Sequence, residues 1–270
     1  MSKRILIFGS NGMLGTYVKN VLDNKHTVIP LERKDYNIEL DNYTKLKELV
    51  SQKKVDIIVN CAGKIPQRGE LITEKRSFFI INSIFPIYLS NICFEMNIKF
   101  IHITTDCVFT GKEGNYNEKS YHDENNNYGL SKSLGEKFDY GTIIRTSIIG
   151  EEKLNKKSLL EWVKSNKNGE INGYNNYIWN GVTCLELSYQ IENIIKNNTY
   201  YNGIKHLFSP NKVSKYELLQ IINNVFQLNI IINKNNLQSK IDKSLSSNFD
   251  FFDNVEPLEI QIKKLKNFSL

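Results

Sequence analysis

The chain has 270 residues, of which 40% are hydrophobic and 24% charged, and its formal net charge is +6 at pH 7. These values predict a globular protein with a sizeable core, built as one large domain or as a domain with a smaller lobe. The lysines form no basic stripe, which argues against nucleic-acid binding. Apolar runs such as Ile5 to Phe8 are far shorter than a membrane span, and no signal-peptide core follows Met1, so a cytoplasmic protein without membrane attachment is expected.

The cysteines give no sign of cross-linking or of metal binding. Cys61, Cys93, Cys107 and Cys184 are scattered, without CxxC or His-paired spacing. Reduced thiols are therefore expected, and no metal site is predicted, since the carboxylates form no cluster that would require one.

The first half of the sequence alternates short apolar strands with helical patterns. The expected strands are residues 4–8, 27–31, 55–60, 100–104 and 142–146, and the expected helices are 13–22, 43–51, 77–96 and 128–138. Near-continuous apolar strands belong in a parallel sheet that is covered on both faces. The alternation predicts an α/β fold with a Rossmann-type, doubly wound parallel sheet in a domain spanning 1–150.

The rhythm changes after about Gly150. Helices are expected at 158–166, 185–196 and 216–226, with short strands near 205–208 and 229–232. We interpret residues 151–270 as a smaller α/β lobe over the carboxyl ends of the strands. Ligands of open α/β sheets bind in that crevice, so this region is expected to contribute mainly to substrate binding.

A glycine-rich turn joins the first strand to the first helix. Its sequence is Gly9-Ser10-Asn11-Gly12-Met13-Leu14-Gly15, which places glycines at i, i+3 and i+6. Glycine permits a tight turn and lets backbone amides approach a pyrophosphate at the positive end of a helix. The position of the turn between a strand and a helix favours a dinucleotide site, and its GxxGxxG spacing resembles the short-chain dehydrogenase/reductase superfamily.

The end of the second strand bears on the choice of dinucleotide. An acidic residue there would accept a bond from the ribose 2′-hydroxyl, whereas an arginine would hold a 2′-phosphate. Glu32 and Arg33 provide both types, and Lys34 follows. The basic pair favours NADPH and leaves NADH possible, while a solvated charged loop is the alternative interpretation.

Tyr128 and Lys132 lie four residues apart and therefore on one face of the predicted helix. An ordinary tyrosine is a poor proton relay at neutral pH unless a cation stabilises its phenolate, which Lys132 would do. The spacing is common by chance, but Thr104 and Thr105 end the fourth strand, from which a hydroxyl can reach the same pocket. Thr105 would bind a carbonyl oxygen, Tyr128 would protonate it, and NADPH would deliver the hydride.

With these features assembled, the sequence resembles the dTDP-4-dehydrorhamnose reductase family of extended short-chain dehydrogenase/reductases, which act on nucleotide sugars. The resemblance covers nearly the whole chain. It rests on residues 9–15, 59–63, Asn82, Thr-Thr-Asp-Cys-Val-Phe at 104–109, Tyr-Gly-Leu-Ser-Lys at 128–132 with Gly135-Glu136, Arg-Thr-Ser at 145–147 and Asp-Lys-Ser-Leu at 242–245.

The resemblance implies NADPH-dependent reduction of a nucleotide-linked 4-keto-6-deoxy sugar. The implied cofactor contacts are Gly9, Asn11, Gly12, Met13, Leu14, Gly15, Arg33, Cys61, Ala62, Gly63, Asn82, Tyr128 and Lys132. The implied substrate contacts are Thr105, Arg145, Trp179 and Asn180, with a core position as the alternative for Trp179.

Cys107 departs from the pattern, because many rhamnose-pathway reductases have tyrosine there and GDP-fucose synthase has a cysteine. A thiol in this place could move a proton at carbons next to the ketone, so we predict a 3- or 5-epimerase activity through Cys107 beside the reductase activity. The histidine that completes this chemistry in GDP-fucose synthase has no match, and a residue of Glu151, Glu152 or Lys153 would have to replace it. The alternative is that Cys107 is a small buried side chain.

Two other functions compete with a reductase. A non-catalytic, dinucleotide-binding regulatory subunit could keep the same fold, although retention of Thr105, Tyr128 and Lys132 argues against it. The second competing function is a redox-neutral nucleotide-sugar epimerase or dehydratase. The dehydratases, however, place an Asp-Glu pair where this chain has Asp106-Cys107. The sequence leaves open the nucleotide, the sugar and the oligomeric state, including a homodimer.

Overall fold

The structure, a computed structural model, describes residues 1–66, 75–153, 156–252 and 254–270. A six-stranded sheet has the order β10-β5-β4-β3-β1-β2, and all neighbouring strands are parallel. The strands are β1 (Arg4–Phe8), β2 (Thr27–Pro30), β3 (Ile57–Asn60), β4 (Lys99–Thr105), β5 (Thr142–Thr146) and β10 (Gly203–His206). The predicted Rossmann-type sheet is confirmed.

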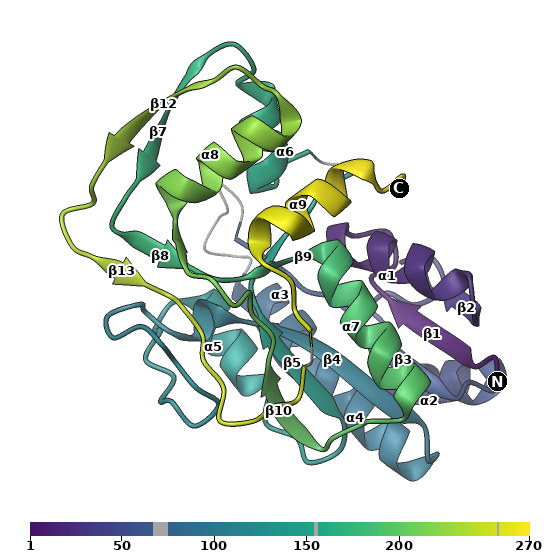
Figure 1. Ribbon diagram of the computed structural model, residues 1–270. Helices are drawn as coiled ribbons and strands as arrows, with labels where there is room; N and C mark the ends of the chain where they lie inside the picture. The colour runs from purple at the N-terminus through teal and green to yellow at the C-terminus, as the bar shows by residue number, and fades with distance from the viewer. Residues whose placement is uncertain (67–74, 154–155, 253) are drawn as a thin grey trace.

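Helices cover both faces of this sheet (Figure 1). They are α1 (Met13–Asp23) and α7 (Cys184–Asn197) on one face, and α2 (Tyr43–Lys53) and α4 (Phe85–Glu95) on the other. Successive side chains of a strand point to opposite faces. In β1, Ile5 and Ile7 accordingly share a core with α1 and α7, whereas Leu6 and Phe8 share one with α2 and α4. Double coverage explains why these strands are apolar almost throughout.

The helix predicted at 77–96 is interrupted by a π-helical turn. It consists of α3 (Lys75–Phe79), the turn η2 (Ile80–Ile84) and α4. The Phe85 amide donates to the Ile80 carbonyl, an i to i−5 bond. Pro86 has no N–H to donate, and a proline ring crowds the carbonyl four residues earlier, here that of Asn82. Such turns are frequent at functional sites.

Among the described residues, one helical run has the length and composition of a membrane span. It is Lys75–Glu95, with a mean hydropathy of 1.5, and half of its most apolar window is buried inside the protein. Phe85, Leu89 and Ile92 on its buried side belong to the core that contains Leu6 of the sheet. Core helices of globular proteins meet the same length and composition criteria.

The remaining elements form a smaller lobe above the carboxyl ends of the strands, at the top of Figure 1. A parallel pair joins β7 to β12, and β8 lies between β11 and β13. The lobe comprises α6 (Leu159–Ser165), β7 (Glu170–Tyr174), β8 (Tyr177–Trp179), β11 (Val213–Ser214), α8 (Lys215–Phe226), β12 (Ile231–Asn235), β13 (Ile241–Asp242) and α9 (Leu258–Asn267).

A single boundary at residue 150 does not separate the sheet from this lobe. Between β8 and β11, the chain returns to the Rossmann half: α7 packs against α1, and β10 pairs with β5 as an edge strand of the main sheet. The short strands β6 (Ile148–Ile149) and β9 (Val182–Thr183) pair with each other where the chain passes between the Rossmann half and the lobe. The strand expected near 205–208 thus belongs to the sheet and not to the lobe.

Candidate active site

The turn after β1 can be built only with glycine at two of its three glycine positions. Gly9 has φ of +74°, and a Cβ there would lie 2.7 Å from the Ala62 backbone nitrogen. A Cβ on Gly15 would lie 2.0 Å from the Gly9 carbonyl oxygen. Gly12 caps α1 without any side-chain hydrogen bond, and no acidic residue occupies the first helical turn. The amino end of α1 is therefore a bare backbone cradle that suits a phosphate.

This cradle lies at the point where the strand order reverses, because the chain goes from β1 to β2 on one side and then to β3 on the other. The strand β1 pairs with β2 on one side and with β3 on the other. The turn at Gly9 accordingly touches Cys61 and Ala62 after β3. Such a switch point is where open α/β sheets bind their ligands. The predicted cofactor residues of the two loops are thus neighbours in space.

Asn82 holds the second of these loops in place. Its Oδ1 accepts from the Lys64 amide at 2.8 Å, and its Nδ2 donates to the Lys64 carbonyl at 2.9 Å and to Ser131 Oγ at 3.1 Å. A Cβ on Gly135 would lie 1.8 Å from the Asn82 carbonyl oxygen, so glycine lets the end of α5 (Asn127–Leu134) approach η2 closely. Asn82 therefore fixes the loop on which the predicted cofactor contacts lie.

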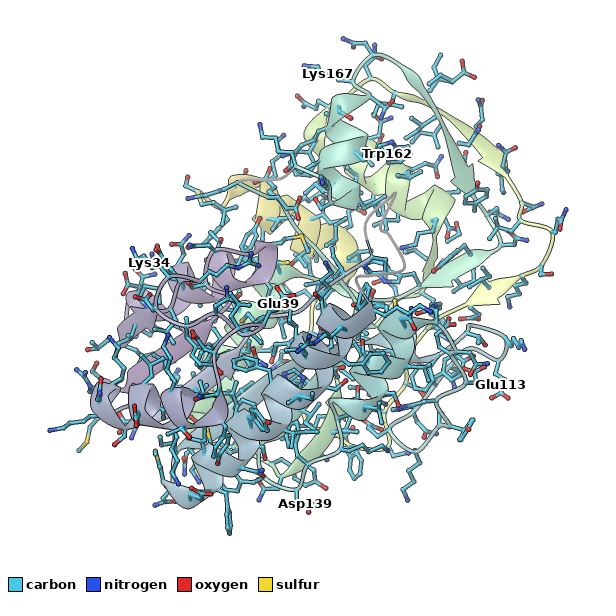
Figure 2. The ribbon with its side chains drawn as sticks, turned by 180° about the vertical axis from the view of Figure 1, so that it is seen from behind. Lys34, Glu39, Glu113, Asp139, Trp162 and Lys167 are labelled. Carbon is cyan, nitrogen blue, oxygen red and sulfur yellow. The ribbon has the colours of Figure 1, made fainter. Side chains whose placement is uncertain are left out.

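The charged residues after β2 are at the surface. Lys34 Nζ lies 2.8 Å from a carboxylate oxygen of Glu32, and both side chains are largely exposed. This pairing lowers the pKa of Glu32. Arg33 is exposed beside them, and Figure 2 shows Lys34 at the outer edge of the Rossmann half. The structure therefore leaves Arg33 accessible to a ligand.

The structure brings Thr105, Tyr128 and Lys132 together. Thr105 ends β4, and its side chain lies next to the Tyr128 phenol, whose pKa it affects. Tyr128 and Lys132 both lie on α5, which begins where the Asn126 side chain accepts from the Gly129 amide at 2.8 Å. The Lys132 ammonium reaches the loop after β3, where a Cβ on Gly63 would lie 3.0 Å from its Nζ. The predicted catalytic residues thus adjoin the predicted cofactor loops.

Burial keeps the Tyr128 phenol protonated. Desolvation raises its pKa above the ordinary value, a neighbouring Cys107 raises it further, and the hydrogen bond with Thr105 lowers it. Lys132 was expected to lower the pKa of Tyr128, but it is not one of the groups that shift this pKa. Burial also lowers the pKa of Lys132 to about 8, which the Glu136 carboxylate opposes. A protonated phenol is the form that can give a proton to a developing alkoxide.

Three charged residues of the site were missed as functional candidates: Asp106, Lys215 and Lys243. Asp106 is buried directly after Thr105, and burial raises its pKa against the opposing effect of the two lysines. Lys215 is the first residue of α8, and its Nζ lies 4.7 Å from the ring centre of Trp179. Lys243 belongs to a motif quoted for the resemblance, but only the folded lobe shows that it faces Asp106.

The predicted substrate contact of Arg145 is not supported. Its side chain is completely buried, and its guanidinium donates to both carboxylate oxygens of Glu136. It also contacts His206 Nε2 at 2.7 Å and His122 Nε2 at 2.8 Å. Arg145 therefore stabilises the protein behind the site, and these two histidines, which the sequence left without partners, are part of that cluster.

Trp179 and Asn180 are also structural residues. Trp179 is buried in the largest hydrophobic core, so its alternative core position is the one observed. The Asn180 side chain is buried and bonds both backbone groups of Leu245, accepting at 2.8 Å and donating at 2.9 Å. Neither side chain is available to a substrate in this arrangement. The neighbouring Tyr177 and Lys215 lie near Asp106 and Cys107.

Residues 3–240 match the family model of the RmlD substrate binding domain, and the chain belongs to this family. Its homologues include nucleotide-sugar reductases, as the resemblance predicted.

Two curated relatives and one solved structure illustrate this. The chain is 25% identical over 233 residues to a dTDP-4-keto-6-deoxy-D-glucose reductase of Streptomyces niveus, covering 82% of this chain and 78% of that protein. It is 28% identical over 230 residues to a dTDP-4-dehydrorhamnose reductase of Aggregatibacter actinomycetemcomitans, covering 79% and 76%. The fold matches that of the Bacillus anthracis dTDP-4-dehydrorhamnose reductase solved with NADP, with a TM-score of 0.84, 20% identity and 99% of each chain covered.

Proposed function

We propose that this protein reduces the keto group of a nucleotide-linked 4-keto-6-deoxy sugar with NADPH. The observation that carries the proposal is the placement of the Thr105 side chain next to the Tyr128 phenol, beside the loop that Lys132 reaches. Relatives named as dTDP-linked keto sugar reductases support this substrate class.

The residues of the site fit such a reduction. NADPH, when bound, supplies the hydride. The bare glycine turn at Gly9 and Gly12 would bind its pyrophosphate, and Arg33 would bind the 2′-phosphate. Thr105 would donate to the carbonyl oxygen, and Tyr128, held protonated by burial, would give its proton to that oxygen as negative charge develops.

The reaction can be tested with a panel of substrates. The purified protein is incubated with NADPH or NADH and with the dTDP-, UDP- and GDP-linked 4-keto-6-deoxy sugars, and absorbance at 340 nm is followed. We expect NADPH oxidation with at least one of them, and a product two mass units heavier than the keto sugar. Oxidation that is equally fast without sugar nucleotide, or none with any of them, contradicts the proposal.

A second activity, epimerisation next to the ketone, is a further candidate because two titratable groups, Cys107 and Lys215, lie beside Asp106 at the same site. Burial and the adjacent Asp106 raise the pKa of the Cys107 thiol to about 12, which makes it a proton donor and a poor base. Burial lowers the pKa of Lys215, and Cys107 is among the groups near its ammonium. Lys215 would then be the base. Of the residues expected for this role, Glu151 is paired with Lys164 and Glu152 binds backbone amides.

This second activity has its own test. With a 4-keto-6-deoxy sugar nucleotide in deuterated water and no NADPH, deuterium should enter C3 or C5, and both Cys107→Ala and Lys215→Met should abolish the uptake. Absence of deuterium at both carbons with the unmodified protein contradicts it and leaves the reductase proposal intact.

A further inference from the structure

One carboxylate oxygen receives hydrogen bonds from two neighbouring side chains of the site. The Thr105 hydroxyl donates to Asp106 Oδ1 at 3.2 Å, and the Cys107 thiol donates to the same oxygen at 3.5 Å. The Cys107 backbone amide in turn donates to Thr105 Oγ1 at 3.2 Å. The short 3-10 turn η3 (Asp106–Val108) makes this possible, because Thr105 caps it.

Other groups near Asp106 come from the C-terminal lobe and from Ser147, which follows β5. Its side chain is 2% exposed. The Ser147 hydroxyl hydrogen-bonds it, and the ammonium groups of Lys215 and Lys243 lie near it. The phenols of Tyr128 and Tyr177 complete the titratable groups that face it. A buried carboxylate needs such donors and cations to remain charged.

The hydrogen-bond directions have a consequence for Thr105. A hydroxyl has one proton and two lone pairs. In the structure that proton is given to Asp106, and one lone pair accepts from the Cys107 amide. The Thr105 hydroxyl must therefore turn away from Asp106 before it can donate to a carbonyl oxygen.

We propose that Asp106 is a positioning residue, which orients the Thr105 hydroxyl and the Cys107 thiol through one shared oxygen. Its relevance to turnover rests on the proposed reductase function, whereas its effect on the Cys107 thiol does not depend on any substrate.

The thiol therefore provides the primary test. Asp106 contributes to the raised pKa of Cys107, both by its charge and by its hydrogen bond. In Asp106→Asn, which removes the charge at nearly constant volume, the thiolate fraction of Cys107 should rise. We expect iodoacetamide to alkylate Cys107 at least threefold faster at pH 9 than in the unmodified protein, measured by mass spectrometry of the Cys107 peptide.

The chain offers a matched control in Asp123, whose carboxylate likewise accepts from a threonine hydroxyl and amide, those of Thr110, but outside the site. Asp123→Asn should leave the alkylation rate of Cys107 unchanged. An unchanged rate in Asp106→Asn, or equal acceleration in both variants, overturns the proposal. Should Asp106→Asn not fold, Ser147→Ala replaces it. Loss of the Ser147 donor strengthens the interaction of Asp106 with the Cys107 thiol, so the alkylation of Cys107 should slow at least twofold. An unchanged rate overturns the proposal.

Kinetics separate positioning from a merely structural role. For Asp106→Asn we expect kcat to fall at least tenfold and the KM for NADPH to change less than threefold. The alkaline limb of the plot of kcat/KM against pH should move to lower pH, because the Asp106 charge raises the pKa of Tyr128. An alkaline limb that does not move contradicts the effect of the Asp106 charge on Tyr128. If the unmodified protein reduces no keto sugar, the proposed function fails while the alkylation test still decides the role of Asp106.

Discussion

Arg145 and Glu136 form an ion pair behind α5, with Arg145 Nη2 2.5 Å from Glu136 Oε2, and neither side chain is exposed to solvent. The other carboxylate oxygen accepts from the Thr104 hydroxyl at 2.8 Å. Thr104 precedes Thr105 on β4, and Glu136 follows Lys132 by one helical turn. The pair thus connects β4, which carries Thr105, to the segment that carries Tyr128 and Lys132.

Breaking this pair should destabilise the protein strongly. Arg145→Met leaves the Glu136 carboxylate buried without its partner, which typically costs about 3–5 kcal/mol. Urea unfolding followed by circular dichroism would measure the loss. Lys45→Met is the control, because Lys45 and Asp41 form an ion pair at the surface, where such pairs contribute roughly 0–1 kcal/mol. Similar losses in the two variants would show that burial of the Arg145 pair is unimportant.

The same cluster predicts how stability depends on pH. Burial and, to a smaller extent, the neighbouring Arg145 cation lower the pKa of His206 from 6.5 to about 4. The unfolded chain therefore binds more protons than the native protein between these two values, so the His206 contribution is complete above pH 6.5 and is lost as the pH falls toward 4. The full effect is on the order of 3 kcal/mol. His122, whose pKa burial also lowers, should act in the same direction.

Unfolding free energies at pH 7 and pH 5 would test this. His206→Gln, which cannot take up a proton, should lose less stability between the two pH values than the unmodified protein. An equal or larger loss in the variant contradicts the assignment. Comparing the two proteins removes the contribution of the carboxyl groups, which they share.

The glycine turn predicts two different outcomes for two similar changes. In Gly15→Ala the new methyl group would collide with the Gly9 carbonyl, so a loss of about 1–3 kcal/mol in unfolding free energy is expected. In Gly12→Ala the nearest atom is 3.3 Å away, so the fold should tolerate the change. The methyl group of Gly12→Ala would instead point into the phosphate cradle, and we expect NADPH affinity to fall at least tenfold by calorimetric titration. Unchanged affinity would place the cofactor elsewhere.

Local features of the sequence were sufficient to predict much of this molecule. Residues 142–146 were predicted as a strand and form β5 with the same bounds, because an apolar run between turns needs no distant information. The expected helix at 128–138 ends at Leu134 instead, since Gly135 caps it and approaches η2. The positions of Gly9 and Gly15 follow from backbone geometry alone, and this is why the turn was recognisable.

Side-chain partners were harder to predict when they came from distant segments. The family resemblance implied a substrate contact for Arg145, but Glu136 and His206, respectively 9 and 61 residues away, surround it. Lys215 gave no local signal, because only the folding of the lobe over the sheet carries α8 to Asp106. The roles of Trp179 and Asn180 depended in the same way on Leu245 and on the lobe core.

The Tyr128→Phe variant tests the central claim most directly. It keeps the ring that packs against Phe78 and removes only the hydroxyl, so the fold and NADPH binding should be retained. Tyr121→Phe, at a fully accessible position nearby, is the control with unchanged turnover. We predict that the rate of keto sugar reduction, followed as NADPH oxidation at 340 nm, falls by roughly 10²–10⁴-fold in Tyr128→Phe. A rate within threefold of the unmodified protein would contradict the assignment of Tyr128 as the proton donor.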